Sequence, residues 1–129
     1  MLLDTHTLVW AMSAPRALSP AAREALETAG ERCVSAASLY EITWKASIGK
    51  WPEVAPLLAN DLDASLRGHG LEVVAASGAI MQRAGSLDWG HRDPFNRIIV
   101  ATALIRGLPV VSKDATLDTL GAAGWSRVW

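Results

Sequence analysis

Acidic side chains stand at the ends of several apolar runs in this chain of 129 residues. Asp4 follows Met-Leu-Leu, and Asp114 comes soon after Leu-Pro-Val-Val. Glu41 lies inside Ser-Leu-Tyr-Glu-Ile, while Asp93 and Asn96 belong to His-Arg-Asp-Pro-Phe-Asn-Arg. Carboxylates gathered at the carboxyl ends of strands are the usual way for a small α/β protein to bind a hard divalent cation through oxygen. The pattern therefore predicts a metal-dependent enzyme, and we interpret it as a nuclease.

Each of these acids also has a simpler explanation. Asp4 and Asp114 can each cap the helix or turn that follows, and position alone does not separate capping from metal binding. Glu41 can form a surface ion pair with Lys45, four residues later. Asp93, directly before a proline, is a typical helix N-cap. Two strand ends with the same feature nevertheless favour the metal interpretation.

Composition narrows the classes of function. A net charge of -1 argues against a general polyanion binder, so any contact with nucleic acid must be local or assisted by a metal. A single cysteine, Cys33, cannot form an internal disulfide, and the histidines lack zinc-ligand spacing. We therefore expect no zinc site and assign no catalytic role to His6, His69 and His91.

The start of the chain bears on its location. Met1 to Asp4 has no basic segment and reaches a charge too early for a signal peptide, and charged residues interrupt every long apolar stretch. We therefore expect a cytoplasmic protein with no membrane partner. Six tryptophans are many for this length, and we expect packing in the core or at interfaces rather than base stacking for Trp10, Trp44, Trp51, Trp89, Trp125 and Trp129.

The elements expected to position the acids alternate between strands and helices. Strands are expected at residues 1–3, 33–34, 71–75 and 108–112, with a fifth at the edge near Val128. Helices are expected from Thr5 or His6 to Met12, over 20–30, from a cap at Ser35 or Ser38 to Gly49, and over 51–67, 77–87 and 94–107. This alternation predicts parallel crossovers and a central sheet covered on both faces. No repeat or linker divides the chain, so we expect one domain spanning 1–129.

Four segments together carry a family resemblance. They are Leu-Leu-Asp-Thr-His-Thr-Leu-Val-Trp at 2–10, Ser-Leu-Tyr-Glu-Ile at 38–42, His-Arg-Asp-Pro-Phe-Asn-Arg-Ile-Ile-Val-Ala-Thr-Ala at 91–103 and Val-Val-Ser-Lys-Asp at 110–114. In this order they strongly resemble the PIN-domain toxins of the VapC family over nearly the whole chain. The resemblance implies a three-layer α/β/α sandwich around a parallel sheet of four to five short strands. It also implies an endoribonuclease that depends on Mg²⁺ or Mn²⁺, a cognate VapB-type antitoxin that blocks its site, and a homodimer.

Carried over by position, Asp4, Glu41 and Asp114 match three of the four acidic site residues of that family. The fourth position holds Asn96, where the family has aspartate. An amide oxygen can still bind a hard cation, but the lost charge should weaken metal binding, and Asp93 on the same helical turn can partly compensate. We therefore expect Asp4, Glu41, Asp93, Asn96 and Asp114 at the catalytic site, with all but Asp93 as metal ligands.

The implied reaction is metal-assisted hydrolysis of a phosphodiester bond. Nearby hydroxyls and cations could position water, phosphate or RNA, although capping and solvated charge explain them equally well: Thr5, Thr7, Ser112, Arg92, Arg97 and Lys113. One alternative is a degenerate PIN domain that binds antitoxin or RNA without cutting, for which Asn96 is the evidence. Another is a phosphatase of the haloacid dehalogenase type, which is disfavoured because that family needs an aspartate where this chain has His6.

Overall fold

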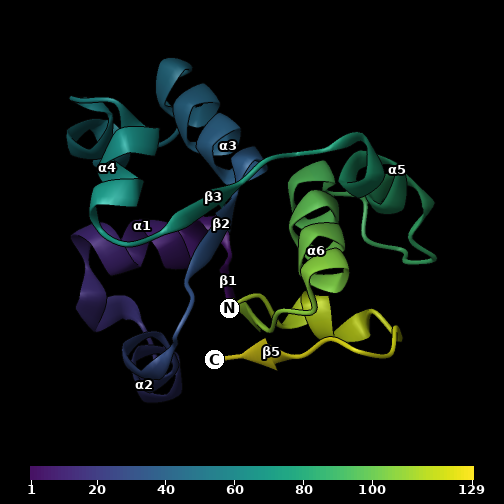
Figure 1. The fold of residues 1–129 in the computed structure, drawn as a ribbon. Coiled ribbons are helices and arrows are strands. Elements are labelled where there is room, and N and C mark those ends of the chain that lie inside the picture. The colour runs from purple at the N-terminus through teal and green to yellow at the C-terminus, as the bar shows by residue number, and fades with distance from the viewer.

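In the computed structural model, which describes residues 1–129, five short strands form one parallel sheet (Figure 1). The strands are β1 (Leu2–Leu3), β2 (Cys33–Ser35), β3 (Glu72–Val74), β4 (Val110–Val111) and β5 (Arg127–Val128), in the order β3-β2-β1-β4-β5. Leu2 is in register with Cys33 on one side and with Val110 on the other. The first strand is therefore the central one, and its carboxyl end delivers the next residue to the middle of one edge of the sheet.

Helices cover both faces of this sheet, as the sequence predicted. They are α1 (Thr5–Ser13), α2 (Pro20–Thr28), α3 (Ala36–Ser47), α4 (Leu62–Gly68), α5 (Gly78–Ser86) and α6 (Pro94–Arg106), with the 3-10 turns η1 (Pro15–Ala17), η2 (Pro52–Leu58) and η3 (Ala115–Thr119). Leu2 packs with α5 and α6 in one core cluster, and Leu3 packs with α1, α3 and α4 in another. Successive strand residues point to opposite faces, so the layers are α/β/α. No helix combines the length and the apolar character needed to cross a membrane.

Local signals set most helix starts. Three helices begin after a serine whose side chain accepts a hydrogen bond from the first turn: Ser19 caps α2, Ser35 caps α3 and Ser77 caps α5. Of the two caps expected for α3, the structure uses Ser35. Ser38 is instead fully buried, and its hydroxyl accepts a 3.0 Å hydrogen bond from Thr5.

Two expectations about element lengths were wrong. The helix expected over 51–67 is divided into η2 and α4, because Pro56 lies inside the first and Asp61 caps the second. The strands expected over 71–75 and 108–112 are shorter, since only Glu72–Val74 and Val110–Val111 pair with neighbours. Although Ser112 lies outside β4, its hydroxyl still bonds Asp4, and the acids still meet at the carboxyl edge of the sheet.

Candidate functional site

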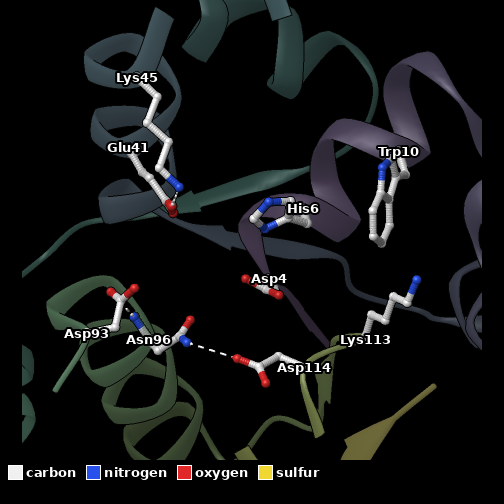
Figure 2. Close-up of a pocket in the computed structure, with 9 residues that line it drawn as sticks. All are labelled: Asp4, His6, Trp10, Glu41, Lys45, Asp93, Asn96, Lys113 and Asp114. Carbon is white, nitrogen blue, oxygen red and sulfur yellow. Dashed lines mark hydrogen bonds and ion pairs between the residues drawn. The ribbon is translucent and has the colours of Figure 1, made fainter. Parts of the chain in front are cut away.

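One cavity of about 350 Å³ opens at the carboxyl edge of the sheet, between α1, α3 and α6 (Figure 2). Its lining contains every site residue that the sequence predicted. The lining residues are Asp4, His6, Trp10, Glu41, Lys45, Asp93, Asn96, Lys113 and Asp114. Residues more than a hundred positions apart in the chain thus share one cavity.

Asp4 forms the buried floor of the cavity, with 6% of its surface exposed. Its Oδ1 accepts a 2.6 Å hydrogen bond from the backbone N–H of Thr5, and its Oδ2 accepts one of 2.7 Å from the hydroxyl of Ser112. The residue therefore caps α1 and lines the site at once. Burial raises the pKa of Asp4, although the Ser112 hydroxyl and the charge of His6 act to lower it. A charged Asp4 is costly here unless a cation lies beside it.

Asp114 approaches the cavity from the end of β4, and it is held in its ionised form. Its Oδ1 accepts hydrogen bonds from the backbone N–H of Thr116 at 2.9 Å and from that residue's hydroxyl at 2.6 Å. Burial acts to raise the pKa of Asp114, but the two Thr116 bonds, the charge of His91 and the amide of Asn96 outweigh it and lower the pKa. The two aspartates of the sheet edge therefore differ: one is stabilised as a carboxylate, and the other is not.

Asp93 and Asn96 reach the cavity from the first turn of α6. The exposed Asp93 caps the helix, because its Oδ1 accepts hydrogen bonds from the backbone N–H groups of Phe95 at 2.8 Å and Asn96 at 3.4 Å. This cap turns the Asn96 side chain into the cavity, where its Nδ2 lies 3.2 Å from Oδ2 of Asp114. Asn96 thus lines the cavity together with the acids.

Glu41 comes from the second turn of α3 and is 5% exposed. Its Oε1 pairs with Nζ of Lys45 at 2.5 Å, so the i,i+4 pair expected from the sequence exists. The expectation that it lies on the surface was wrong, because α3 packs against both α1 and α6 and encloses Glu41 between them. A buried carboxylate balanced by one lysine is available to a cation only if Lys45 moves aside or the ion binds through water.

The donor set suits a hard divalent cation. The cavity offers carboxylate and amide oxygens and no thiol, which is the chemistry that Mg²⁺ and Mn²⁺ prefer. Its acids do not form a group of three whose oxygens all lie within 4.8 Å of one another. An ion bound here would therefore contact some of them directly and others through water, and Mg²⁺ typically retains several waters.

The cavity also contains four residues outside the predicted set of site residues, of which only Lys113 was considered from the sequence as a cation that could guide RNA. His6, Trp10, Lys45 and Lys113 line it together with the acids. His6 and Trp10 stand four residues apart on α1, so they share a face of the helix that begins immediately after Asp4. That spacing was available in the sequence and could have placed both side chains beside the acid. Of the six tryptophans expected to pack, only Trp89 is buried.

Arg97 does not point toward a substrate. Its guanidinium donates hydrogen bonds of 2.7 to 3.3 Å to five backbone carbonyls, which belong to Ala84, Gly85, Leu87, Trp89 and His91. The side chain therefore fastens the segment between α5 and α6 to the first turn of α6. This segment includes His91, whose Nε2 lies 3.3 Å from the Asn96 amide. Arg97 positions the site from outside it.

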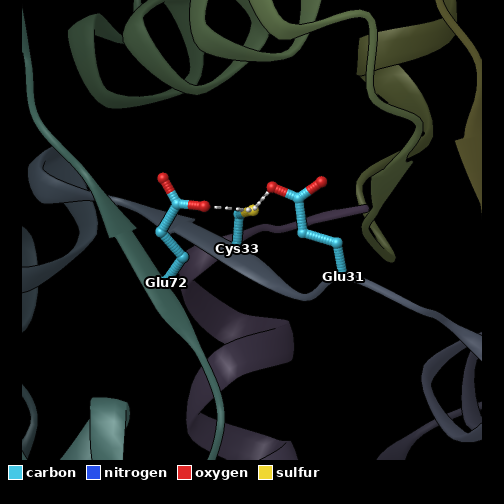
Figure 3. Close-up of side chains that lie close together, drawn as sticks. All are labelled: Glu31, Cys33 and Glu72. Atoms are coloured by element: carbon cyan, nitrogen blue, oxygen red, sulfur yellow. Dashed lines mark hydrogen bonds between the residues drawn. The ribbon is translucent and has the colours of Figure 1, made fainter.

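A second cluster of ionisable groups lies at the opposite, amino edge of the sheet (Figure 3). The donor atoms of Glu31, Cys33 and Glu72 lie within 4.8 Å of one another, which is close enough to hold a metal. Arg106 already pairs with both carboxylates, at 2.8 Å from Glu31 and 3.0 Å from Glu72. Burial and the two glutamates raise the pKa of the Cys33 thiol to about 12. The cluster is therefore a structural contact around an unreactive thiol, in which Arg106 offsets part of the charge of the two carboxylates.

Comparison with known sequences places this geometry in context. A sequence profile described as "PIN domain" matches residues 1–122. The chain is 33% identical over 119 residues to a protein named Ribonuclease VapC22 from Mycobacterium tuberculosis strain H37Rv. The match covers 91% of this chain and 88% of that protein.

Solved structures share the fold at lower identity. A toxin–antitoxin complex from Klebsiella pneumoniae contains a chain with a TM-score of 0.63 and 20% identity, with 96% of this chain and 93% of that one covered. A DNA-bound VapBC from Salmonella typhimurium gives a TM-score of 0.66 at 18% identity, covering 98% and 96%. VapBC2 from Rickettsia felis, bound to a promoter DNA fragment, gives 0.65 at 16% identity, covering 99% and 98%. At these identities the likeness concerns the fold.

Proposed function

Since the chain belongs to the PIN-domain family and, within it, to the VapC ribonucleases, we propose that residues 1–129 form one PIN domain that hydrolyses RNA phosphodiester bonds with Mg²⁺ or Mn²⁺. The observation that carries the proposal is the convergence of Asp4, Glu41, Asn96 and Asp114 on one cavity. These are the positions at which the family resemblance expects its acids. The reaction class follows from the family, and the residues follow from the cavity.

In this proposal the charged side chains bind the cation, and the uncharged ones orient them or add a neutral ligand. Asp4 and Asp114 hold the cation, Ser112 and Thr116 fix their orientation by hydrogen bonds, and Asn96 contributes its amide oxygen. A cation held by these residues would supply the chemistry of a Lewis acid, which is to activate a water and to offset charge on the leaving oxygen. A positive ion in the cavity also removes the cost of a buried, ionised Asp4. It further offsets the chain's lack of general basic charge, so that phosphate can approach.

Glu41 and Asp93 have more peripheral places in the same scheme. Glu41 supplies a buried carboxylate that Lys45 balances, and we assign it to ordering water or cation at the α3 side. Asp93 at the rim caps α6 and adds negative charge near the neutral Asn96. This placement supports a partial compensation for the missing fourth acid.

We also propose a cognate VapB-type antitoxin as partner, a homodimer as the free form and the cytoplasm as the place of action. The chain's structural relatives include members of toxin–antitoxin complexes. Exposed apolar side chains at Tyr40, Trp44 and Met81 support contact with another protein surface. Co-expression with the antitoxin encoded beside the gene, followed by size-exclusion chromatography with light scattering, tests both assemblies.

The decisive experiment combines Mn²⁺ titration calorimetry with cleavage of a single-stranded RNA. Asp4→Asn should abolish both, while Asp88→Asn, a change to an exposed acid outside the cavity, should affect neither. Metal binding and cleavage that survive Asp4→Asn would overturn the assignment of the site.

The second candidate function is a binding module that does not cut RNA. The observation that favours it is Asn96, whose uncharged amide donates a hydrogen bond to Asp114 and so satisfies part of that carboxylate without a metal. This function predicts no Mn²⁺ binding and no cleavage by the parent chain, with both gained in Asn96→Asp. Growth inhibition on expression without antitoxin should then also appear only in Asn96→Asp.

A further inference from the structure

We propose that His6 and Trp10 form an aromatic wall on which a nucleobase beside the scissile phosphate stacks, while Lys113 contacts a neighbouring phosphate. The inference rests on the proposed ribonuclease function and adds to it the residues that grip the RNA. His6 and Trp10 are the aromatic residues of the cavity lining. They lie on the side of the cavity opposite Asn96 (Figure 2).

The helix geometry places both rings in the cavity. His6 and Trp10 are four residues apart on α1, and their ring centroids lie 5.9 Å apart. Leu8 and Val9 of the same helix are buried in one core cluster with Leu3 and Val34 of the sheet, whereas His6 and Trp10 line the cavity. The wall therefore begins two residues after Asp4, which lines the same cavity.

Two further tryptophans support the wall from outside the cavity. The ring of Trp51 lies 4.7 Å from that of His6, and Trp129 lies 5.7 Å from Trp10. His6 is exposed and Trp10 partly exposed, so surfaces of both rings remain accessible. Rings held in place before binding lose little conformational entropy when a base stacks on them.

Two lysines lie beside these aromatic rings, and one of them, Lys45, also pairs with Glu41. Nζ of Lys113 lies 5.7 Å from the centre of the Trp10 ring, and Nζ of Lys45 lies 5.3 Å from that of Trp51. An aromatic surface with lysines beside it is the arrangement that binds single-stranded nucleic acid, because bases stack while phosphates meet positive charge. The cavity thus combines the acids with an aromatic surface on α1 and with lysines beside it.

A nearby aromatic group lacks these features. Tyr40, Trp44 and Phe95 lie outside the cavity lining, and their rings contact one another, with centroids 5.9 and 6.3 Å from Phe95. The cation–aromatic contacts of the molecule involve Trp10 and Trp51, and none involves this group. Trp44 therefore provides a matched control: an exposed tryptophan close to the site but outside the wall.

The test measures binding without catalysis. A fluorescently labelled single-stranded RNA is titrated in EDTA, as an intact strand and as a set of strands with one base removed at successive positions. Trp10→Ala should weaken binding about tenfold, the effect expected for one stacked base, and Trp44→Ala should leave binding unchanged. Removing one particular base should cause the same loss in the parent chain and no additional loss in Trp10→Ala.

Further variants keep the result interpretable. Trp10→Phe retains an aromatic face and should restore most of the affinity, and His6→Ala, at an exposed position, should weaken binding without disturbing the fold. The proposal would be overturned if, at every position, removing a base and replacing Trp10 by alanine each weakened binding independently. It would also be overturned if Trp44→Ala weakened binding and Trp10→Ala did not. Failure of the ribonuclease function is distinguishable, because cleavage with Mn²⁺ would then be absent while binding in EDTA still depended on Trp10.

Discussion

The amide of Asn96 donates a 3.2 Å hydrogen bond to Oδ2 of Asp114, across the cavity between α6 and β4. A donor and an acceptor meet here at a position where the family resemblance expects two carboxylates. Two carboxylates at this distance repel one another unless a cation lies between them. The asparagine therefore stabilises the metal-free cavity and removes one charge from the metal-bound cavity. Both effects can be measured, as stability without metal and as affinity for metal.

Replacing Asn96 by aspartate should shift the balance toward the metal. In Asn96→Asp the new carboxylate faces Asp114, so Mn²⁺ should bind about tenfold more tightly, or about 1.4 kcal/mol. In EDTA the same repulsion should lower the free energy of unfolding by about 1 kcal/mol. Titration calorimetry and urea unfolding, each with and without Mn²⁺, measure the two effects.

Tighter Mn²⁺ binding together with lower stability in EDTA would indicate an electrostatic effect rather than a general loss of packing. Asn96→Ala also loses the hydrogen bond but adds no charge, so it should be less stable in EDTA and gain no Mn²⁺ affinity. An Asn96→Asp protein that is destabilised equally with and without Mn²⁺ would show that the carboxylate at this position does not contact the ion.

Asp4 should make stability in EDTA depend on pH in an unusual direction. Burial raises the pKa of Asp4 in the folded chain above its ordinary value of 3.8. A raised pKa means that Asp4 contributes stability below pH 3.8 that is lost as the pH rises through the folded pKa. The difference in free energy of unfolding between the parent chain and Asp4→Asn should therefore shrink or reverse over this interval.

Mn²⁺ should oppose this loss. The ion binds the charged form of Asp4, so saturating Mn²⁺ should stabilise the parent chain above the folded pKa and leave Asp4→Asn unchanged. Urea unfolding from pH 3 to pH 8 provides the measurement. A parent chain whose stability relative to Asp4→Asn rises with pH in EDTA would contradict the raised pKa.

Arg97 should be important for stability although it binds no substrate. Arg97→Met removes the donor to five carbonyls and leaves those of them that are buried unsatisfied, at a cost of about 3 kcal/mol. Arg92→Met is the control, because the exposed Arg92 makes no hydrogen bond and should change stability by less than about 0.5 kcal/mol. Thermal unfolding compares the stability of the two variants. Equal losses of stability would show that Arg97 does not anchor the segment between α5 and α6.

The sequence was most informative where local signals and the fold agree. The alternation of strands and helices predicted the parallel sheet and its two helical layers, because each element's apolar residues require a partner on a particular face. The caps at Ser19 and Asp93 predicted the starts of α2 and α6, since a side-chain acceptor before a proline has few other uses. Asp4 and Asp114 were correctly placed at one edge, and each proved to be a cap as well as a lining residue.

The remaining features depend on contacts that no local signal encodes. Glu41 looks like a surface residue beside Lys45, and only the packing of α3 against α1 and α6 buries it. Arg97 resembles a solvated charge, and its carbonyl partners are set by the path of the chain between α5 and α6. The proposed wall of His6 and Trp10 departs from the sequence prediction, which expected Trp10 to serve packing rather than base stacking and gave His6 no role, although the helical spacing of the two is visible in the sequence.

Cys33 should resist thiol reagents as long as the chain is folded. Burial, together with the neighbouring Glu31 and Glu72, disfavours a thiolate, and the pKa of Cys33, raised to about 12, leaves very little of the thiol ionised at pH 8. An ordinary exposed thiol would be ionised to a large fraction at this pH. Reaction with a disulfide reagent should therefore be slow in buffer and fast in denaturing urea, with Cys33→Ser as the blank. Rapid labelling of the native chain would show that the cluster opens to solvent, and Arg106 would then not be holding the two carboxylates over the thiol as the structure has them.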